Sequence, residues 1–177
     1  MPIVNQIDLD ISEFQKKVYQ YDEKTNLFLG GGRGGAKTYL AALLAVLHCL
    51  KYKNKAHVAY VREYVRSLDE FRSHVEEICS HIAYKIVFPV SGKVVDFVTY
   101  NITDKKFKFF NGAEILLAQL RDDKDYSKFH GISYSLIIVD EICEFTEGQF
   151  TNLVDKLKTC LRGDPLVSRR LIYLANP

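Results

Sequence analysis

Residues Gly31–Thr38 have the sequence GGRGGAKT, and this stretch decides the fold. It matches the phosphate-binding pattern G-x-x-x-x-G-K-[ST] everywhere except Ala36, where the pattern requires glycine. Glycines let backbone N–H groups turn toward phosphate oxygens, and the start of the next helix adds positive potential. The pattern assigns Lys37 to the β- and γ-phosphates and the Thr38 hydroxyl to Mg²⁺. We expect the methyl group of Ala36 to be tolerated if that residue keeps a negative φ.

The segments on both sides place this loop between a strand and a helix. Asn26–Gly30 is an apolar run typical of a buried strand, and leucines recur at helical spacing from residue 40 to residue 50. Upstream, apolar residues at positions 11, 14 and 18 predict a short helix, with Asp10 or Ser12 as its cap. The local order is therefore helix, strand, glycine loop and helix.

The middle of the chain continues this alternation and then departs from it. His57–Val61 indicates a second strand and Ser67–Ile82 a second helix, an order that predicts a parallel sheet covered on its faces. Val94–Tyr100, Lys106–Phe110 and Glu114–Ala118 are strand-like runs. The pair at 111–112, Asn-Gly, favours a hairpin between the last two runs. We expect antiparallel strands at the edge of the sheet.

A second chemical motif follows a buried strand. Leu136–Val139 is entirely apolar and ends at Asp140 and Glu141. Such a pair is common at strand ends, but after a phosphate loop it predicts an Asp140 that holds Mg²⁺ through water. Glu141 would then orient and deprotonate the attacking water as a general base. A helix over Glu147–Leu161 and a last strand over 171–174 complete the expected elements.

Charge stabilisation of the transferred phosphoryl group requires cations, which makes the nearby arginines candidates. Arg33 lies in the loop itself, whereas Arg62, Arg66 and Arg121 are possible arginine fingers that surface ion pairs explain equally well. Asn176 follows the last strand and could contact the γ-phosphate or the attacking water. Its alternative role is a turn residue before proline.

Two alternative roles for the glycines remain open. Gly30–Gly35 also satisfies the dinucleotide-binding pattern G-x-G-x-x-G, with Glu63 as a possible ribose ligand. That pattern does not explain Lys37 and Thr38 or the distant acidic pair. A purely structural glycine turn is the second alternative.

Composition limits the functional classes without choosing one. The 177 residues suit one compact domain, and a net charge of +2 permits a DNA partner without arguing for it. The four cysteines lack metal-binding spacing, which favours buried thiols in a reducing cytosol. The longest apolar stretch, Tyr39–Leu47, is too short to span a bilayer, so we expect no membrane segment.

These motifs together resemble the ATPase domain of the large terminase subunit, the DNA-packaging motor of tailed bacteriophages. Gln15 resembles the family's adenine-reading glutamine, although Gln20 competes for that role. Gly31–Thr38 is similar to the family's variant loop, with arginine third and alanine sixth. Further similarity lies at 62–68, at 130–131 before the acidic strand, and in Leu174–Pro177, which resembles the coupling motif.

The resemblance implies a three-layer α/β P-loop NTPase of the ASCE, RecA-like type over residues 1–177, without the family's carboxy-terminal nuclease domain. It implies ATP hydrolysis with Mg²⁺, no DNA cleavage, and translocation of double-stranded DNA into a procapsid. The implied partners are DNA, the portal protein, the small terminase subunit and further copies in a ring, with a monomer in isolation. The implied location is the cytoplasm of the infected bacterial host.

Two further functions stay open at this level. One is a helicase-like DNA motor, which would usually carry a Ser/Thr motif where Ala175–Pro177 stands. The other is a nucleotide-binding assembly module without turnover, which Ala36 permits and Glu141 argues against.

Overall fold

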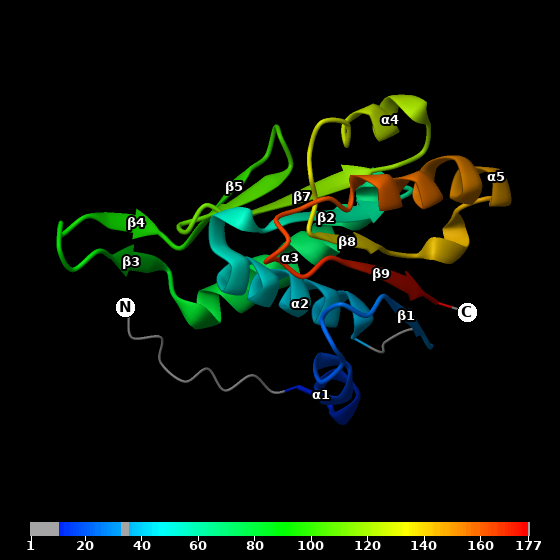
Figure 1. Cartoon of the computed structure of the whole chain (residues 1–177). Coiled ribbons are helices and arrows are strands. Elements are labelled where there is room, and N and C mark those ends of the chain that lie inside the picture. Colours follow the sequence, from blue (N-terminus) through cyan, green and yellow to red (C-terminus); the bar gives the residue numbers. More distant parts are fainter. Residues whose placement is uncertain (1–10, 33–35, 177) are drawn as a thin grey trace.

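The computed structural model of the chain describes residues 11–32 and 36–176, and its elements alternate as the sequence predicts (Figure 1). Five helices and nine strands lie within the described residues, besides short 3₁₀ and π turns. Their bounds are α1 Glu13–Tyr19, β1 Leu27–Gly30, α2 Lys37–Tyr52, β2 His57–Arg62, α3 Leu68–Ile82, β3 Lys85–Val87, β4 Val94–Asp96, β5 Val98–Asn101, β6 Lys106–Phe109, β7 Glu114–Gln119, α4 Asp123–Ser127, β8 Leu136–Val139, α5 Glu147–Gln149 and β9 Arg170–Ala175.

A seven-stranded sheet in the order β1-β9-β8-β2-β7-β6-β5 forms the centre of the molecule. Its first five strands are parallel, so their carboxyl ends lie at one edge. Strands β7, β6 and β5 pair antiparallel, and Gly112 takes a φ of +87° in the β6–β7 turn, which confirms the predicted hairpin and its position at the sheet edge.

Two apolar clusters make this a three-layer fold. On one face, α2 and α3 pack on alternating strand residues such as Val58, Tyr60 and Ile138. On the other face, the segment 153–160 and the residues after α4 pack on the intervening positions, among them Val61 and Val139. Residues two apart on a strand face the same side, so each strand contributes to both clusters. Figure 1 shows α2 and α3 on the opposite side of the sheet from α4 and α5.

The structure corrects two predicted elements and adds two. Val94–Tyr100 is not one strand, because the chain leaves β4 at Phe97, whose N–H bonds to Tyr84, and enters β5 in the main sheet. Glu147–Leu161 is helical but only briefly α-helical: a π turn at Phe150–Val154 and a 3₁₀ turn at Asp155–Cys160 follow α5. Neither the short strand β3 nor α4 was expected from the sequence.

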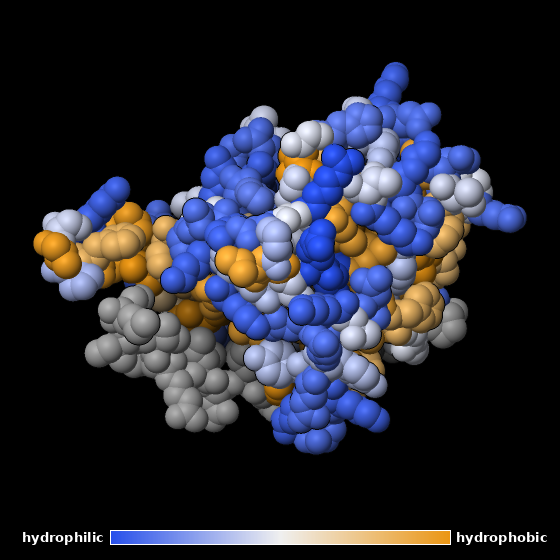
Figure 2. Space-filling view, viewed as in Figure 1, coloured by the Kyte–Doolittle hydropathy of each residue, from blue (hydrophilic) through white to orange (hydrophobic). Residues whose placement is uncertain are grey.

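The β3–β4 hairpin projects from the body of the molecule (Figure 1), and its apolar residues colour that end orange in Figure 2. Val87, Val90 and Val94 are more than half exposed there. Within the described ranges, the helices are all too short or too polar to cross a membrane.

Candidate functional site

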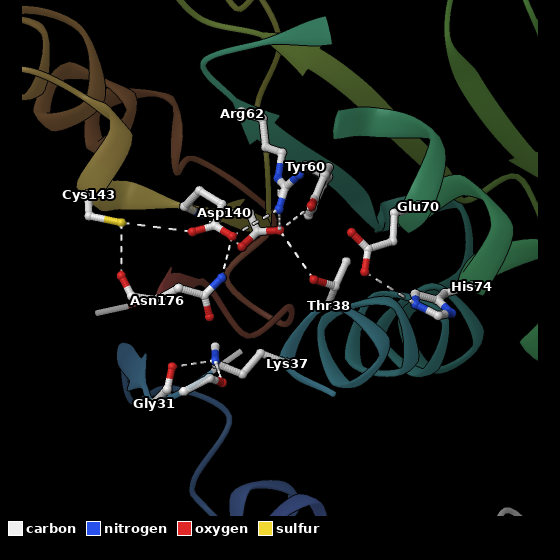
Figure 3. Close-up of polar contacts among 12 residues, drawn as sticks. Gly31, Lys37, Thr38, Tyr60, Arg62, Glu70, His74, Asp140, Cys143 and Asn176 are labelled. Atoms are coloured by element: carbon white, nitrogen blue, oxygen red, sulfur yellow. Dashed lines mark hydrogen bonds and ion pairs between the residues drawn. The ribbon is translucent and has the colours of Figure 1, made fainter. Parts of the chain in front are cut away.

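Four neighbouring strands deliver the predicted residues to one edge of the sheet. The glycine loop follows β1, Asn176 follows β9, Asp140 and Glu141 follow β8, and Arg62 ends β2. Because β9 lies between β1 and β8, Asn176 stands between the loop and the acidic pair. Figure 3 shows this arrangement, with Lys37 on one side of Asn176 and Asp140 on the other. The parallel order of the strands therefore assembles the site.

The loop holds the Lys37 side chain in a position suited to phosphate. Lys37 is 8% exposed, and its ammonium donates to the carbonyl oxygens of Gly31 at 2.7 Å and Gly32 at 3.0 Å. Gly31 has a φ of +146°, which side-chain-bearing residues rarely adopt. These two carbonyl oxygens accept the hydrogen bonds that, according to the pattern, the Lys37 ammonium gives to phosphate oxygens. Arg33, Gly34 and Gly35 lie outside the described residues.

Ala36 does not keep the negative φ on which we expected its tolerance to depend. Its φ is +50° and its ψ is +28°, in the left-handed region, at the amino end of α2. Alanine in that region is strained by about 1–2 kcal/mol because its Cβ approaches the following carbonyl oxygen. The condition of a negative φ is therefore not met, and the alanine is accommodated under strain.

Asp140 is buried at 3% exposure and receives hydrogen bonds from two side chains of β2. The Tyr60 hydroxyl donates to Oδ2, and Arg62 reaches the same oxygen from both Nε and a terminal nitrogen at 3.0 Å. Burial and the Asp140 charge raise the pKa of Tyr60 well above its ordinary value, so the phenol remains a donor. Burial lowers the pKa of Arg62, but Tyr60 and the two acids raise it overall, so the guanidinium remains charged.

Thr38 and Asp140 face each other as a Mg²⁺ site would require. The Thr38 hydroxyl lies 3.5 Å from Oδ2 of Asp140, at the start of α2. Mg²⁺ prefers oxygen ligands, keeps several waters, and uses one or two protein groups together with phosphate oxygens. A hydroxyl and a carboxylate on the phosphate side of the site fit this preference. No group of three or more His, Cys, Asp or Glu ligands occurs in the described part of the chain.

Glu141 is held in a strained conformation by groups from three elements. Its φ is +50° and its ψ +51°, a left-handed conformation that costs about 1–3 kcal/mol in a side-chain-bearing residue. The Asn176 side chain donates to Oε1, and Arg62 approaches the same oxygen at 3.5 Å. The Cys143 thiol lies 3.8 Å from Oε2 and donates to the Asn176 carbonyl at 3.1 Å. Oε2, with only a weak thiol neighbour, is the oxygen better placed to accept a proton.

A pocket of about 370 Å³ adjoins the loop on the side of α1. That volume is in the range of small-molecule sites. Ser12 and Phe14 contribute one wall, and Gly30–Gly32, Ala36 and Lys37 form the rest. Gln15 is buried behind this wall: its Oε1 accepts the Ser12 N–H at 2.8 Å, and its amide donates to the Ala36 carbonyl at 3.5 Å. It thus caps α1 and ties it to the loop, whereas Gln20 is exposed at the end of α1.

The remaining predicted arginines differ from Arg62. Arg66 is exposed, and the Arg121 guanidinium lies over the Tyr64 ring at 5.4 Å. Within the described parts of the chain, Arg62 is the arginine that is buried and bridges the acidic pair. Sequence reasoning missed Tyr60 and Cys143. The two-residue period of a strand was a usable signal for Tyr60, because it places Tyr60 on the same face as Arg62; Cys143 offered none.

Comparison with known proteins gives a family. Residues 28–170 match the family model described as terminase large subunit, T4likevirus-type, N-terminal. Among curated proteins nothing matches.

Solved structures share the fold at low identity. The large terminase of a thermophilic bacteriophage matches with a TM-score of 0.74 at 16% identity, over 96% of this chain and 40% of that one. The HK97 bacteriophage large terminase matches with a TM-score of 0.65 at 18% identity, over 94% and 33%. The N-terminal domain of the bacteriophage phi29 DNA packaging ATPase matches with a TM-score of 0.60 at 17% identity, over 93% and 78%.

The thermophilic-phage terminase has also been solved in complex with ATP-gamma-S. This chain spans about 40% of the length of that terminase. The match to the family model covers most of the sequence, and the chain belongs to the family of the N-terminal region of T4-like terminase large subunits.

Proposed function

We propose that this chain is the ATP-hydrolysing part of a motor that packages double-stranded viral DNA. The observation that carries the proposal is the convergence of Lys37, Thr38, Asp140, Glu141 and Asn176 at the ends of three adjacent strands. This set combines a phosphate-binding cation, oxygen ligands for a metal and a held carboxylate. The complex of the thermophilic-phage terminase with ATP-gamma-S supports ATP as the ligand class.

In the proposed reaction the phosphates lie along the loop and Lys37 exchanges the Gly31 and Gly32 carbonyls for phosphate oxygens. Thr38 and Asp140 would hold Mg²⁺, which would supply positive charge beside the phosphates. Glu141 accepts a proton from water as the water oxygen bonds to the γ-phosphorus and the bond to the β-phosphate oxygen breaks. ADP and phosphate leave. Asn176 orients Glu141, and Arg62 offsets part of the negative charge of the two acids.

Family membership supports the larger setting. In it, copies of the complete protein form a ring on the portal of a procapsid in the cytoplasm of the infected bacterium, receive DNA with the small terminase subunit, and drive it inward. A helicase-like motor is less well supported, because the family match covers residues 28–170. This chain carries the proposed hydrolysis; cleavage of DNA is not part of the proposal.

The test is Mg²⁺-dependent ATP binding and steady-state hydrolysis by wild type, Lys37→Ala and Glu141→Gln at high protein concentration. Lys37→Ala should lose both activities, and Glu141→Gln should keep binding while losing hydrolysis. The exposed residues Lys17 and Glu147 provide matched controls as Lys17→Ala and Glu147→Gln. Equal binding by all variants with no turnover would instead support a nucleotide-binding assembly module.

A further inference from the structure

A second pocket, of about 360 Å³, lies at the opposite end of the sheet from the phosphate loop. The second half of α2 and the beginnings of β8 and β9 line it, together with Tyr19 at the end of α1. Apolar side chains form most of its wall: Tyr19, Leu44, Leu47, Leu50, Leu136 and Ile172. Its size suits a small ligand with an apolar part.

A buried arginine in the wall of this pocket has hydrogen-bond donors without partners. Arg170, the first residue of β9, is 6% exposed and forms part of the wall. Its Nε and one terminal nitrogen are buried and have no hydrogen-bond partner among the described residues. An unpaired buried charge is costly, and native proteins pair such groups with anions or satisfy their donors. The arginine fork matches the geometry of an oxyanion.

Glu23, the acidic side chain in the pocket wall, accepts hydrogen bonds from groups other than Arg170. Oε2 of Glu23 accepts the Lys51 ammonium and the Tyr52 hydroxyl, each at 2.8 Å. Burial lowers the pKa of Arg170, and the charges of Glu23 and Asp22 partly oppose this from beyond hydrogen-bond range. The Glu23 carboxylate therefore stabilises the charge of Arg170 at a distance but accepts no hydrogen bond from its two buried nitrogens.

The histidine in the pocket wall contributes no charge at neutral pH. Ring Nε2 of His48 is 2.8 Å from the Ser135 hydroxyl, and burial lowers the His48 pKa to about 4. Of the lining side chains, Arg170 and Lys51 are positive and Glu23 is negative. The lining therefore carries a net positive charge, and Arg170 is its buried cation.

We propose that this pocket binds a small molecule that carries one oxyanion group on a short apolar body, with the oxyanion on Arg170. Carboxylates and phosphate monoesters share this chemistry. The site is separate from the nucleotide site, because it lies where β8 and β9 begin rather than where they end.

Calorimetric titration of the full chain with hexanoate and with hexyl phosphate tests the proposal, with hexanol as the neutral probe of the same length. We expect saturable binding of at least one acid, and the stronger one identifies carboxylate or phosphate as the source. Hexanol should bind at least tenfold more weakly, because charge-assisted hydrogen bonds supply that difference. Arg170→Met should lose about tenfold or more, whereas Arg169→Met, at the exposed neighbouring position, should not.

One control variant and one alternative measurement test whether binding occurs at Arg170. Hexyl phosphate could also occupy the phosphate loop, so Lys37→Ala must retain the binding that depends on Arg170. If Arg170→Met does not fold, the Arg170 Nε–H signal in wild-type NMR spectra replaces it, and this signal should shift on titration with the bound acid. Absence of saturable acid binding by wild type, equal binding by Arg170→Met, or an unmoved Nε–H signal would overturn the proposal.

Discussion

The side-chain amide of Asn176 donates a hydrogen bond to Oε1 of Glu141, which joins the end of β9 to the end of β8. The same oxygen lies 3.5 Å from Arg62. The carboxylate that we assign as general base is therefore held from two sides, by a neutral donor and a charged one. Movement of either donor would change the direction in which Glu141 presents its free oxygen.

Asn176→Ala should reduce the kcat of ATP hydrolysis while leaving ATP affinity within about twofold. Removing a single oriented donor from an active site costs about 100-fold in rate. Asn176 contacts Glu141 rather than Lys37 or the loop, so binding should survive. Steady-state hydrolysis and equilibrium binding measure the two effects, with Asn152→Ala at an exposed position as the control. Equal losses in binding and turnover would place Asn176 on the nucleotide instead.

Arg62→Met should destabilise the folded chain by about 3–5 kcal/mol. Both Arg62 and Asp140 have side chains exposed by less than a tenth, and loss of one partner leaves the other buried without its counter-ion. Urea unfolding at pH 7 measures the change, and Arg66→Met provides the matched exposed control. The double variant Arg62→Met, Asp140→Asn should recover part of the loss. A single variant as stable as wild type would show that the ion pair contributes nothing.

The sequence predicted which strand ends meet at one edge of the sheet better than it predicted local conformation. Residues 37, 38, 140, 141 and 176 converge as expected, because a phosphate loop and an acidic strand tip in a parallel sheet must share one edge. The sequence pattern did not predict the backbone conformations of the residues in this region. The positive φ of Ala36 and Glu141 depends on packing around the strand ends, since intrinsic preference opposes it.

Outside the site, too, the sequence predicted where elements lie but not their detailed geometry. Apolar periodicity located β1, β2, β8 and β9 within two residues of their observed bounds. It could not show that the run from 94 to 100 divides between two sheets, because both halves alternate alike and the break depends on a tertiary contact at Phe97. It also predicted the inward face of the helix after 147 without distinguishing α from π and 3₁₀ geometry.

Ala36→Gly should stabilise the chain by about 1 kcal/mol. Glycine adopts a φ of +50° without the Cβ clash that alanine suffers, which more than offsets its greater freedom in the unfolded chain. The same substitution inside α2, Ala45→Gly, should instead lower stability, because a helix interior disfavours glycine. Urea unfolding of both variants gives opposite signs if the strain at Ala36 is real. Loss of stability in both would contradict it.

Stability should fall as the pH drops from 6.5 toward 4, in part because of His48. Its pKa is lowered from 6.5 to about 4 by burial, opposed by Glu23 and assisted by Lys51 and Arg170. Between these values the unfolded chain binds a proton that the folded chain does not, so the contribution is complete above pH 6.5 and is lost progressively as the pH falls toward 4. The loss is at most about 3 kcal/mol. The difference between the unfolding free energies at pH 7.5 and pH 5 should be smaller in His48→Gln than in wild type. In the exposed control His81→Gln this difference should be as large as in wild type.

Alkylation of Cys143 should stop hydrolysis. It is the exposed one of the four cysteines, all of which are described, and burial raises the pKa of Cys79 to about 12, so the other thiols should react slowly. Iodoacetamide would add a bulky amide beside Glu141 and the Asn176 carbonyl, and displace the groups that orient the proposed base. Mass spectrometry should find one rapidly modified cysteine, and the hydrolysis rate should fall in proportion to that modification. In Cys143→Ser the hydrolysis rate after iodoacetamide treatment should remain close to the rate of the untreated variant. A fall in that variant similar to the fall in wild type would show that alkylation of another residue causes the loss.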